Sequence, residues 1–184
     1  MTREEAYNLL KEKVQTQNLI KHSFAAEACM RALAEHFGED SEKWGMTGLL
    51  HDIDYEETKN EPEKHSLLGA EILEKHGAGK DISEAVKTHN EMHNILPESK
   101  MAKAIYVVDP LTGLIVASTL VLPSKKIVDL TAENVLNRYK EGSFAKGANR
   151  EIIGKCRDLL DLTLEEFVKI CLEAMKKINN ELGL

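Results

Sequence analysis

A histidine followed directly by an aspartate, His51-Asp52, ends the apolar run Gly48-Leu49-Leu50. Adjacent side chains on a helix point about 100° apart, but at a helix end they can still converge on one ion. An imidazole nitrogen and a carboxylate oxygen together suit zinc, iron or manganese. Short motifs also match by chance, and a single pair of this kind is most often a helix end with two polar residues. A metal site therefore needs support from other residues.

Four more residues of these types stand at helix ends or kinks and fall on apolar faces. His22 and His65 lie near the starts of predicted helices, and His89 continues an apolar face. Asp109 interrupts an apolar run just before Pro110, which removes a backbone hydrogen bond. Buried together, these groups would be costly unless a cation pairs them. They predict one metal pocket lined from several helices, with ligands His22, His51, Asp52, His65, His89 and Asp109.

Helical periodicity covers most of the chain, and no segment alternates with period two long enough to predict a strand. Residues 15–21 and the acidic stretch 54–63 are expected to be loops, the second facing solvent. The fold class is therefore all-α, with eight or nine helices. One domain is expected over 1–122, including an N-terminal helix, and a C-terminal helical extension over 123–184 packs on it. The predicted helices are 3–15, 21–38, 41–53, 62–76, one from 81, 97–122 and 164–182.

Composition indicates a soluble globular protein, with 184 residues and 42% hydrophobic residues. The net charge of −7 argues against a nucleic-acid polymer as partner, but a bound metal would still allow a small phosphorylated substrate. Three scattered cysteines predict core residues rather than disulfides. The charged start and an apolar run far short of about 20 residues predict no signal peptide and no membrane span, so the cytoplasm is expected.

A basic segment follows Pro123. Arg138, Lys146 and Arg150 flank a glycine-bearing loop that could fold over the pocket and bind phosphate. The alternative is ordinary surface charge, because long basic side chains are mostly exposed. The substrate-binding hypothesis requires this loop to pack beside Asp109.

The ordered set of candidate ligands resembles the HD-domain superfamily of metal-dependent phosphohydrolases. Its core motif is similar to His22, then Gly48-Leu49-Leu50-His51-Asp52, then Asp109. The further histidines His65, before Gly69-Ala70, and His89, in Lys87-Thr88-His89-Asn90, resemble the extra ligands of its two-metal branch. That branch includes HD-type diadenosine tetraphosphatases and HD-GYP cyclic-dinucleotide phosphodiesterases. The resemblance runs from His22 to about Thr119 and implies an HD-domain helical bundle.

The sequence departs from that branch in one motif. HD-GYP and related members carry a lysine three residues after the motif aspartate, where this chain has Tyr55, and the Gly-Tyr-Pro signature is absent. Neither cyclic-dinucleotide hydrolysis nor tetraphosphatase activity therefore transfers directly.

The resemblance implies metal-assisted hydrolysis of a nucleotide or small phosphorylated metabolite, with His51 and Asp52 as the catalytic pair. His22, His51, Asp52 and Asp109 would hold one divalent ion, and His65 and His89 a second, with Asp52 bridging. Iron or manganese is expected, and zinc, nickel or magnesium is allowed. Two alternatives stay open: a di-iron oxygenase of the same fold, and a non-catalytic nucleotide- or metal-sensing module. A homodimer is also allowed.

Overall fold

The computed structural model describes all 184 residues and contains helices and loops without a strand, which confirms the all-α prediction. There are more helices than expected, because the predicted C-terminal helix divides at Ile178 and short helices fill the segment before it. Two 3-10 helices are η1 (Glu91–His93) and η2 (Ile127–Asp129). The α-helices are α1 (Arg3–Lys13), α2 (Gln17–Phe37), α3 (Ser41–Leu50), α4 (Tyr55–Thr58), α5 (Leu67–Lys75), α6 (Lys80–Thr88), α7 (Lys100–Leu120), α8 (Ala132–Lys140), α9 (Arg150–Gly154), α10 (Cys156–Leu160), α11 (Leu164–Lys177) and α12 (Asn179–Leu182).

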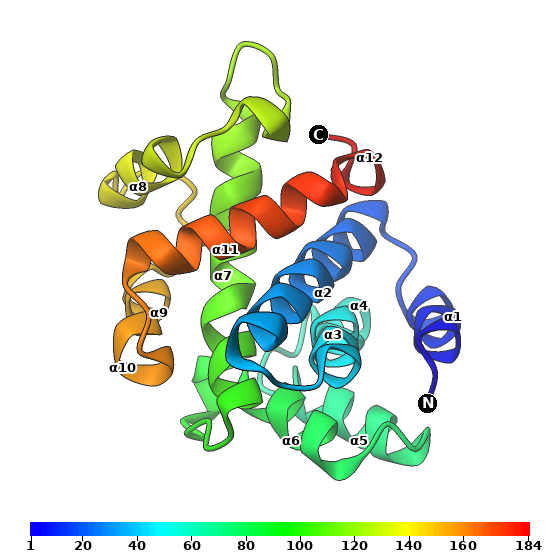
Figure 1. Ribbon diagram of the computed structural model, residues 1–184. Helices are drawn as coiled ribbons and strands as arrows, with labels where there is room; N and C mark the ends of the chain where they lie inside the picture. Colours follow the sequence, from blue (N-terminus) through cyan, green and yellow to red (C-terminus); the bar gives the residue numbers. More distant parts are fainter.

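Helix α7 passes through the centre of the molecule (Figure 1) and contacts α2, α6 and α8 to α11. By length and composition alone it could cross a membrane, but 67% of its most apolar window is buried inside the protein. It is therefore the core helix around which the others pack. Pro110 lies within it, next to Asp109.

Helices α2 and α3 have the most extensive contact of any helix pair in the fold, and Gly48 permits their close approach. A Cβ on Gly48 would lie 2.6 Å from the carbonyl carbon and oxygen of Ala26 and 2.7 Å from the amide nitrogen of Glu27. Backbone atoms of a helix cannot move aside cheaply, so this position requires glycine. The close approach brings His22 of α2 beside His51 at the end of α3.

Several predicted helix boundaries are wrong. Helix α2 begins at Gln17 inside the expected loop 15–21, and buried Ile20 packs its first turns onto the core. Helix α3 ends at Leu50 rather than at 53, and Asp40 caps its start by accepting hydrogen bonds from two backbone N–H groups at 3.0 and 3.1 Å. Helix α5 begins only at Leu67, because Ser66 adopts a φ of +71°.

One hydrophobic core extends from α1 to α12, and α11 contributes Phe167, Cys171 and Met175 to it. Figure 1 shows α11 crossing α7 beside α2, and contacts join it to both helices. All three cysteines are buried and free, as predicted. A division of the chain at 122/123 stays a proposal, because the core is shared by both parts.

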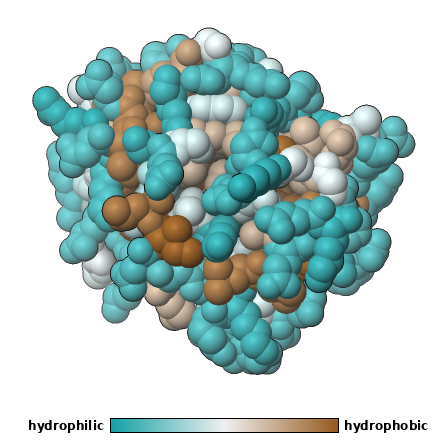
Figure 2. All heavy atoms as spheres, turned by 90° about the horizontal axis from the view of Figure 1, so that it is seen from below, coloured by the Kyte–Doolittle hydropathy of each residue, from teal (hydrophilic) through white to brown (hydrophobic).

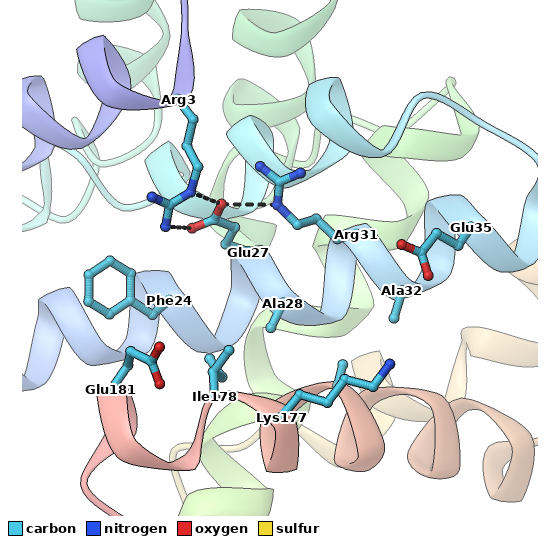
Figure 3. Close-up of a pocket in the computed structure, with 11 residues that line it drawn as sticks. Arg3, Phe24, Glu27, Ala28, Arg31, Ala32, Glu35, Lys177, Ile178 and Glu181 are labelled. Carbon is cyan, nitrogen blue, oxygen red and sulfur yellow. Dashed lines mark hydrogen bonds and ion pairs between the residues drawn. The ribbon is translucent and has the colours of Figure 1, made fainter.

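Buried Glu27 ties α1 to α2. Its carboxylate accepts hydrogen bonds from Arg3 at 2.6 and 2.9 Å and from Arg31 at 3.0 Å (Figure 3). A cavity of about 340 Å³ adjoins these residues between α2 and α11. Because two guanidinium groups already pair the buried charge, this network is structural.

Hydrophilic side chains cover most of the face in Figure 2, and the apolar residues there form small separate patches.

Candidate metal centre

The first group of converging ligand atoms joins α2, the end of α3 and the middle of α7. The Nε2 atom of His22 lies 3.0 Å from Asp109 Oδ1, 3.2 Å from His51 Nε2 and 3.5 Å from Asp52 Oδ2. His51 Nε2 lies 3.6 Å from the same Asp52 oxygen and 3.7 Å from Asp109 Oδ1. Two imidazoles and two carboxylates therefore point at one small volume.

The second group is built around the other oxygen of Asp52. Asp52 Oδ1 lies 3.3 Å from His65 Nε2 and 3.4 Å from His89 Nε2, and the two Nε2 atoms are 3.2 Å apart. His65 lies in the turn before α5, and His89 directly follows α6. Each group of His and Asp side chains has the spacing of a metal-binding cluster. Asp52 stands between them with one oxygen toward each.

Backbone carbonyls fix two of the histidine rings. His51 Nδ1 donates to the Gly48 carbonyl at 2.8 Å, and His89 Nδ1 donates to the Val86 carbonyl at 2.6 Å. A carbonyl only accepts, so each Nδ1 carries a hydrogen and each Nε2 is left to the site.

Side chains fix the other two rings in the same sense. His65 Nδ1 lies 3.0 Å from Asp54 Oδ1, and its hydrogen bonds to that carboxylate. The Thr112 hydroxyl donates to the Asp109 carbonyl at 2.8 Å, so its oxygen accepts from His22 Nδ1 at 3.1 Å. Partners of this kind orient metal-ligating histidines and raise their basicity.

A divalent cation fits this arrangement. With every Nδ1 protonated, the Nε2 lone pairs of His22 and His51 face each other at 3.2 Å, and so do those of His65 and His89. Facing lone pairs repel unless a proton or a metal ion lies between them. Each pair, together with one oxygen of Asp52, is a group of ligand atoms that could hold a cation, and the atom types suit transition metals.

The electrostatics of the residues agree with a site for positive charge. Burial opposes a charge on His51, but Asp52 and Asp109 outweigh it and raise the pKa of His51 to about 9. Burial likewise opposes a charge on His65, but Asp52 and Asp54 raise its pKa to about 10. Burial would raise the pKa of Asp52, yet the surrounding histidines hold that pKa well below its usual range.

Asp54 is a site residue that the sequence interpretation placed wrongly, in a solvent-facing loop. It is fully buried, and it accepts hydrogen bonds from His65 Nδ1, from the Ser66 N–H at 2.8 Å and from the Gly69 N–H at 2.9 Å. One feature of the sequence could have pointed to Asp54: a histidine that faces inward, as His65 was predicted to do, needs a hydrogen-bond acceptor for its Nδ1 atom. Sequence spacing does not show which of several nearby acids supplies it.

Tyr55 stands where the resembling families carry a lysine. Its ring meets the His65 ring edge-on at 5.3 Å between centroids, and the residue is 42% exposed. The second group therefore borders an aromatic side chain rather than a cation.

The three basic residues predicted to bind substrate occupy different places. Lys146 lines a pocket of about 340 Å³ together with His22 and Asp109. The Arg150 guanidinium donates instead to the backbone carbonyls of the same loop, at residues 144, 145 and 148. The Arg138 guanidinium donates to Glu141 at 2.8 Å. The loop thus packs beside Asp109 as the hypothesis required, with Lys146 as its residue in the pocket.

The fold is a helical bundle, and His and Asp side chains converge inside it. These two features together are those of an all-α domain that binds divalent metals. The HD domain family model matches residues 19–114, just over half of the chain, and this chain belongs to the HD domain family. The matched residues contain every proposed metal ligand. HD domains bind divalent metals, which agrees with the cluster.

Similar proteins include several named Ribonuclease Y. That of Nitratidesulfovibrio vulgaris (strain DP4) is 34% identical over 98 residues, covering 53% of this chain and 18% of the relative. That of Lawsonia intracellularis is 29% identical over 140 residues, covering 74% and 27%. That of Thermotoga maritima is 27% identical over 168 residues, covering 90% and 33%. The chain therefore spans between about a fifth and a third of the length of these relatives.

Proposed function

We propose that this chain is a metal-dependent phosphohydrolase that acts on a nucleotide or a small phosphorylated metabolite. The observation that carries the proposal is the pair of ligand groups that share Asp52. His22, His51, Asp52 and Asp109 would hold one ion, and Asp52, His65 and His89 the other. Such ions polarise a phosphoryl oxygen and lower the pKa of bound water. Iron or manganese is the proposed metal.

The open side of the site indicates where substrate enters. The side chains of Asp109 and His22 are 32% and 24% exposed, whereas those of His51 and His89 are 0% and 2% exposed. A substrate therefore approaches over Asp109 and His22, from the pocket that contains Lys146. The ammonium group of Lys146 would attract a phosphate there, and Arg150 would act by holding the loop.

Hydrolysis of an RNA phosphodiester is the second candidate function. The similarity to proteins named Ribonuclease Y favours it and runs against the expectation that no nucleic-acid polymer is bound. A net charge of −7 still favours a small substrate, because proteins that bind nucleic-acid polymers usually carry a basic face. Both candidates require cleavage of a phosphorus–oxygen bond, and both assign it to the same two ligand groups.

A substrate comparison tests the proposal. The protein loaded with manganese or iron is assayed for product release from nucleotides, small phosphate esters and a short RNA oligonucleotide. Release from the small compounds, lost in Asp52→Asn and kept in the exposed control Asp129→Asn, supports the proposal. Cleavage of RNA alone supports the second candidate. Oxygen uptake by the iron form would indicate the oxygenase alternative, and ligand binding without turnover a sensor.

A further inference from the structure

Gly113 is a helical glycine without a structural reason to be glycine. Those at 45, 48, 69 and 154 each have an atom within 3.1 Å of the position that a Cβ would occupy. Gly113 lies within α7, has no atom within 4 Å of that position and is not among the residues of positive φ. Glycine inside a helix costs stability relative to alanine. Packing within the protein does not explain this cost.

The space over Gly113 joins two pockets. The pocket with His22, Asp109 and Lys146 includes Gly113 in its wall. A second pocket of about 420 Å³ also includes His22 and Gly113 and continues toward Leu120 and the C-terminal residues. The two pockets therefore meet at the open edge of the metal centre.

The second pocket is apolar where the first is charged. Val116, Ala117, Leu120, Leu182 and Leu184 line it, with Lys21 and Asn18 at its rim. Leu120 is 50% exposed, which leaves its side chain free to contact a ligand.

Helix geometry aligns these residues with the metal centre. Positions 109, 113, 116, 117 and 120 fall on one stripe of α7, since they are three or four residues apart. At 1.5 Å per residue, the stripe from 109 to 120 rises about 16 Å. That length is greater than the length of a phosphate ester with a three-carbon chain.

We propose that this stripe is the floor of one substrate groove, and that the substrate carries an apolar or aromatic group that crosses Gly113 and lies against Val116 and Leu120. This inference rests on the proposed function and names its substrate class: a phosphate compound with an anionic end at Asp109 and Lys146 and an apolar end at the C-terminal residues. Glycine at 113 keeps the passage between the two ends open.

Two phosphate esters test the groove. The ratio of kcat/KM for 1-naphthyl phosphate to kcat/KM for glycerol 2-phosphate is measured in the metal-loaded wild type and in Gly113→Leu. We expect this ratio to fall about ten-fold or more in the variant, since a blocked apolar subsite discriminates by that order. Val128→Ala, an exposed change in η2 that lies outside both pockets, is the control and should leave the ratio unchanged. An unchanged ratio in Gly113→Leu overturns the groove.

A binding measurement separates the groove from catalysis. Amide resonances of residues 113, 116 and 182 are followed by NMR during titration with 1-naphthyl phosphate and, separately, inorganic phosphate. Shifts at all three residues with the naphthyl ester alone support the groove even if neither ester is hydrolysed, in which case only the proposed function fails. Absence of shifts at 116 and 182 overturns the groove even in an active enzyme.

Discussion

Asp52 connects the two ligand groups through its two carboxylate oxygens, and each neighbouring ring is fixed by a hydrogen bond at Nδ1. Asp52 Oδ2 faces His22 and Oδ1 faces His65, at 3.5 and 3.3 Å. At the scale of single residues, the site therefore depends on the hydrogen-bond partners of the histidine Nδ1 atoms as much as on the ligands themselves. Asp54 is the clearest case, because it is the hydrogen-bond partner of His65 Nδ1.

Loss of the Asp54 carboxylate should lower metal affinity at the second group, formed by Asp52, His65 and His89, and leave the first group unaffected. In Asp54→Asn the amide group must rotate to keep an acceptor toward His65 and loses the carboxylate charge. We expect metal affinity at this group to fall about ten- to hundred-fold. Isothermal titration with manganese measures it, and Glu57→Ala, an exposed acid on the same segment, is the control. Equal loss of affinity in both variants, or in neither, would contradict the role given to Asp54.

Metal binding should release protons. The pKa values of about 9 for His51 and about 10 for His65 mean that both rings are charged near pH 7.5 in the metal-free protein. A ligating Nε2 must lose its proton, so apparent affinity rises with pH up to those values. Without metal, the raised pKa values contribute stability below pH 6.5, the ordinary histidine value, and this stability disappears as pH rises through 9 and 10.

Calorimetry in two buffers of different ionisation enthalpy counts the released protons. Thermal unfolding of the metal-free protein between pH 7 and pH 10 checks whether stability falls as the pH rises. No proton release, together with a melting temperature that rises over this range, would mean that the histidines are neutral before metal binds.

At the scale of the elements, the site depends on how closely α2 approaches α3. Gly48 sets that approach, since any Cβ there meets the backbone of α2. Gly45, one turn earlier on α3, differs in kind: a Cβ there would lie 2.6 Å from the Nε atom of Arg31, which belongs to a side chain and not to the backbone of α2.

Gly48→Ala should therefore separate α2 from α3, and Gly45→Ala should not. We expect Gly48→Ala to cost about 1–3 kcal/mol of unfolding free energy, as overpacking does. Metal content should fall as well, because His22 moves away from His51. Urea unfolding and elemental analysis compare the two variants. If Gly45→Ala lowers the metal content as much as Gly48→Ala does, the backbone contact is not what positions the site.

The elements also show which features the sequence could predict. The predicted helix starts at residues 3 and 164 and the helix end at 38 are correct, because the side-chain caps Thr2 and Thr163 and the left-handed glycine at 38 each act within one turn of chain. The ligand set was recognisable because its members are His and Asp residues on apolar faces, and most of them lie near a helix end or, like Asp109, beside a proline. Asp54 and the start of α5 were misplaced, because long-range hydrogen bonds between them decide both.

At the scale of the whole molecule, α7 links the metal centre to the rest of the core. It carries Asp109 and Thr112 at the site and continues past Gly113 along the stripe that lines the apolar pocket. Helices α11 and α12 pack against α2, which is a neighbour of α7. The part after residue 122 thus supplies both Lys146 and one wall of the apolar pocket. A cytoplasmic location and a homodimer stay predictions.

The number of divalent ions per chain tests the two-metal centre most directly. Elemental analysis of manganese- or iron-loaded protein should give two ions per wild-type chain and two in Asp129→Asn. Asp52→Ala should bind neither ion, because it removes the one carboxylate that faces both groups. Full metal content in Asp52→Ala, or a single ion in the saturated wild type, would contradict a dinuclear site bridged by Asp52.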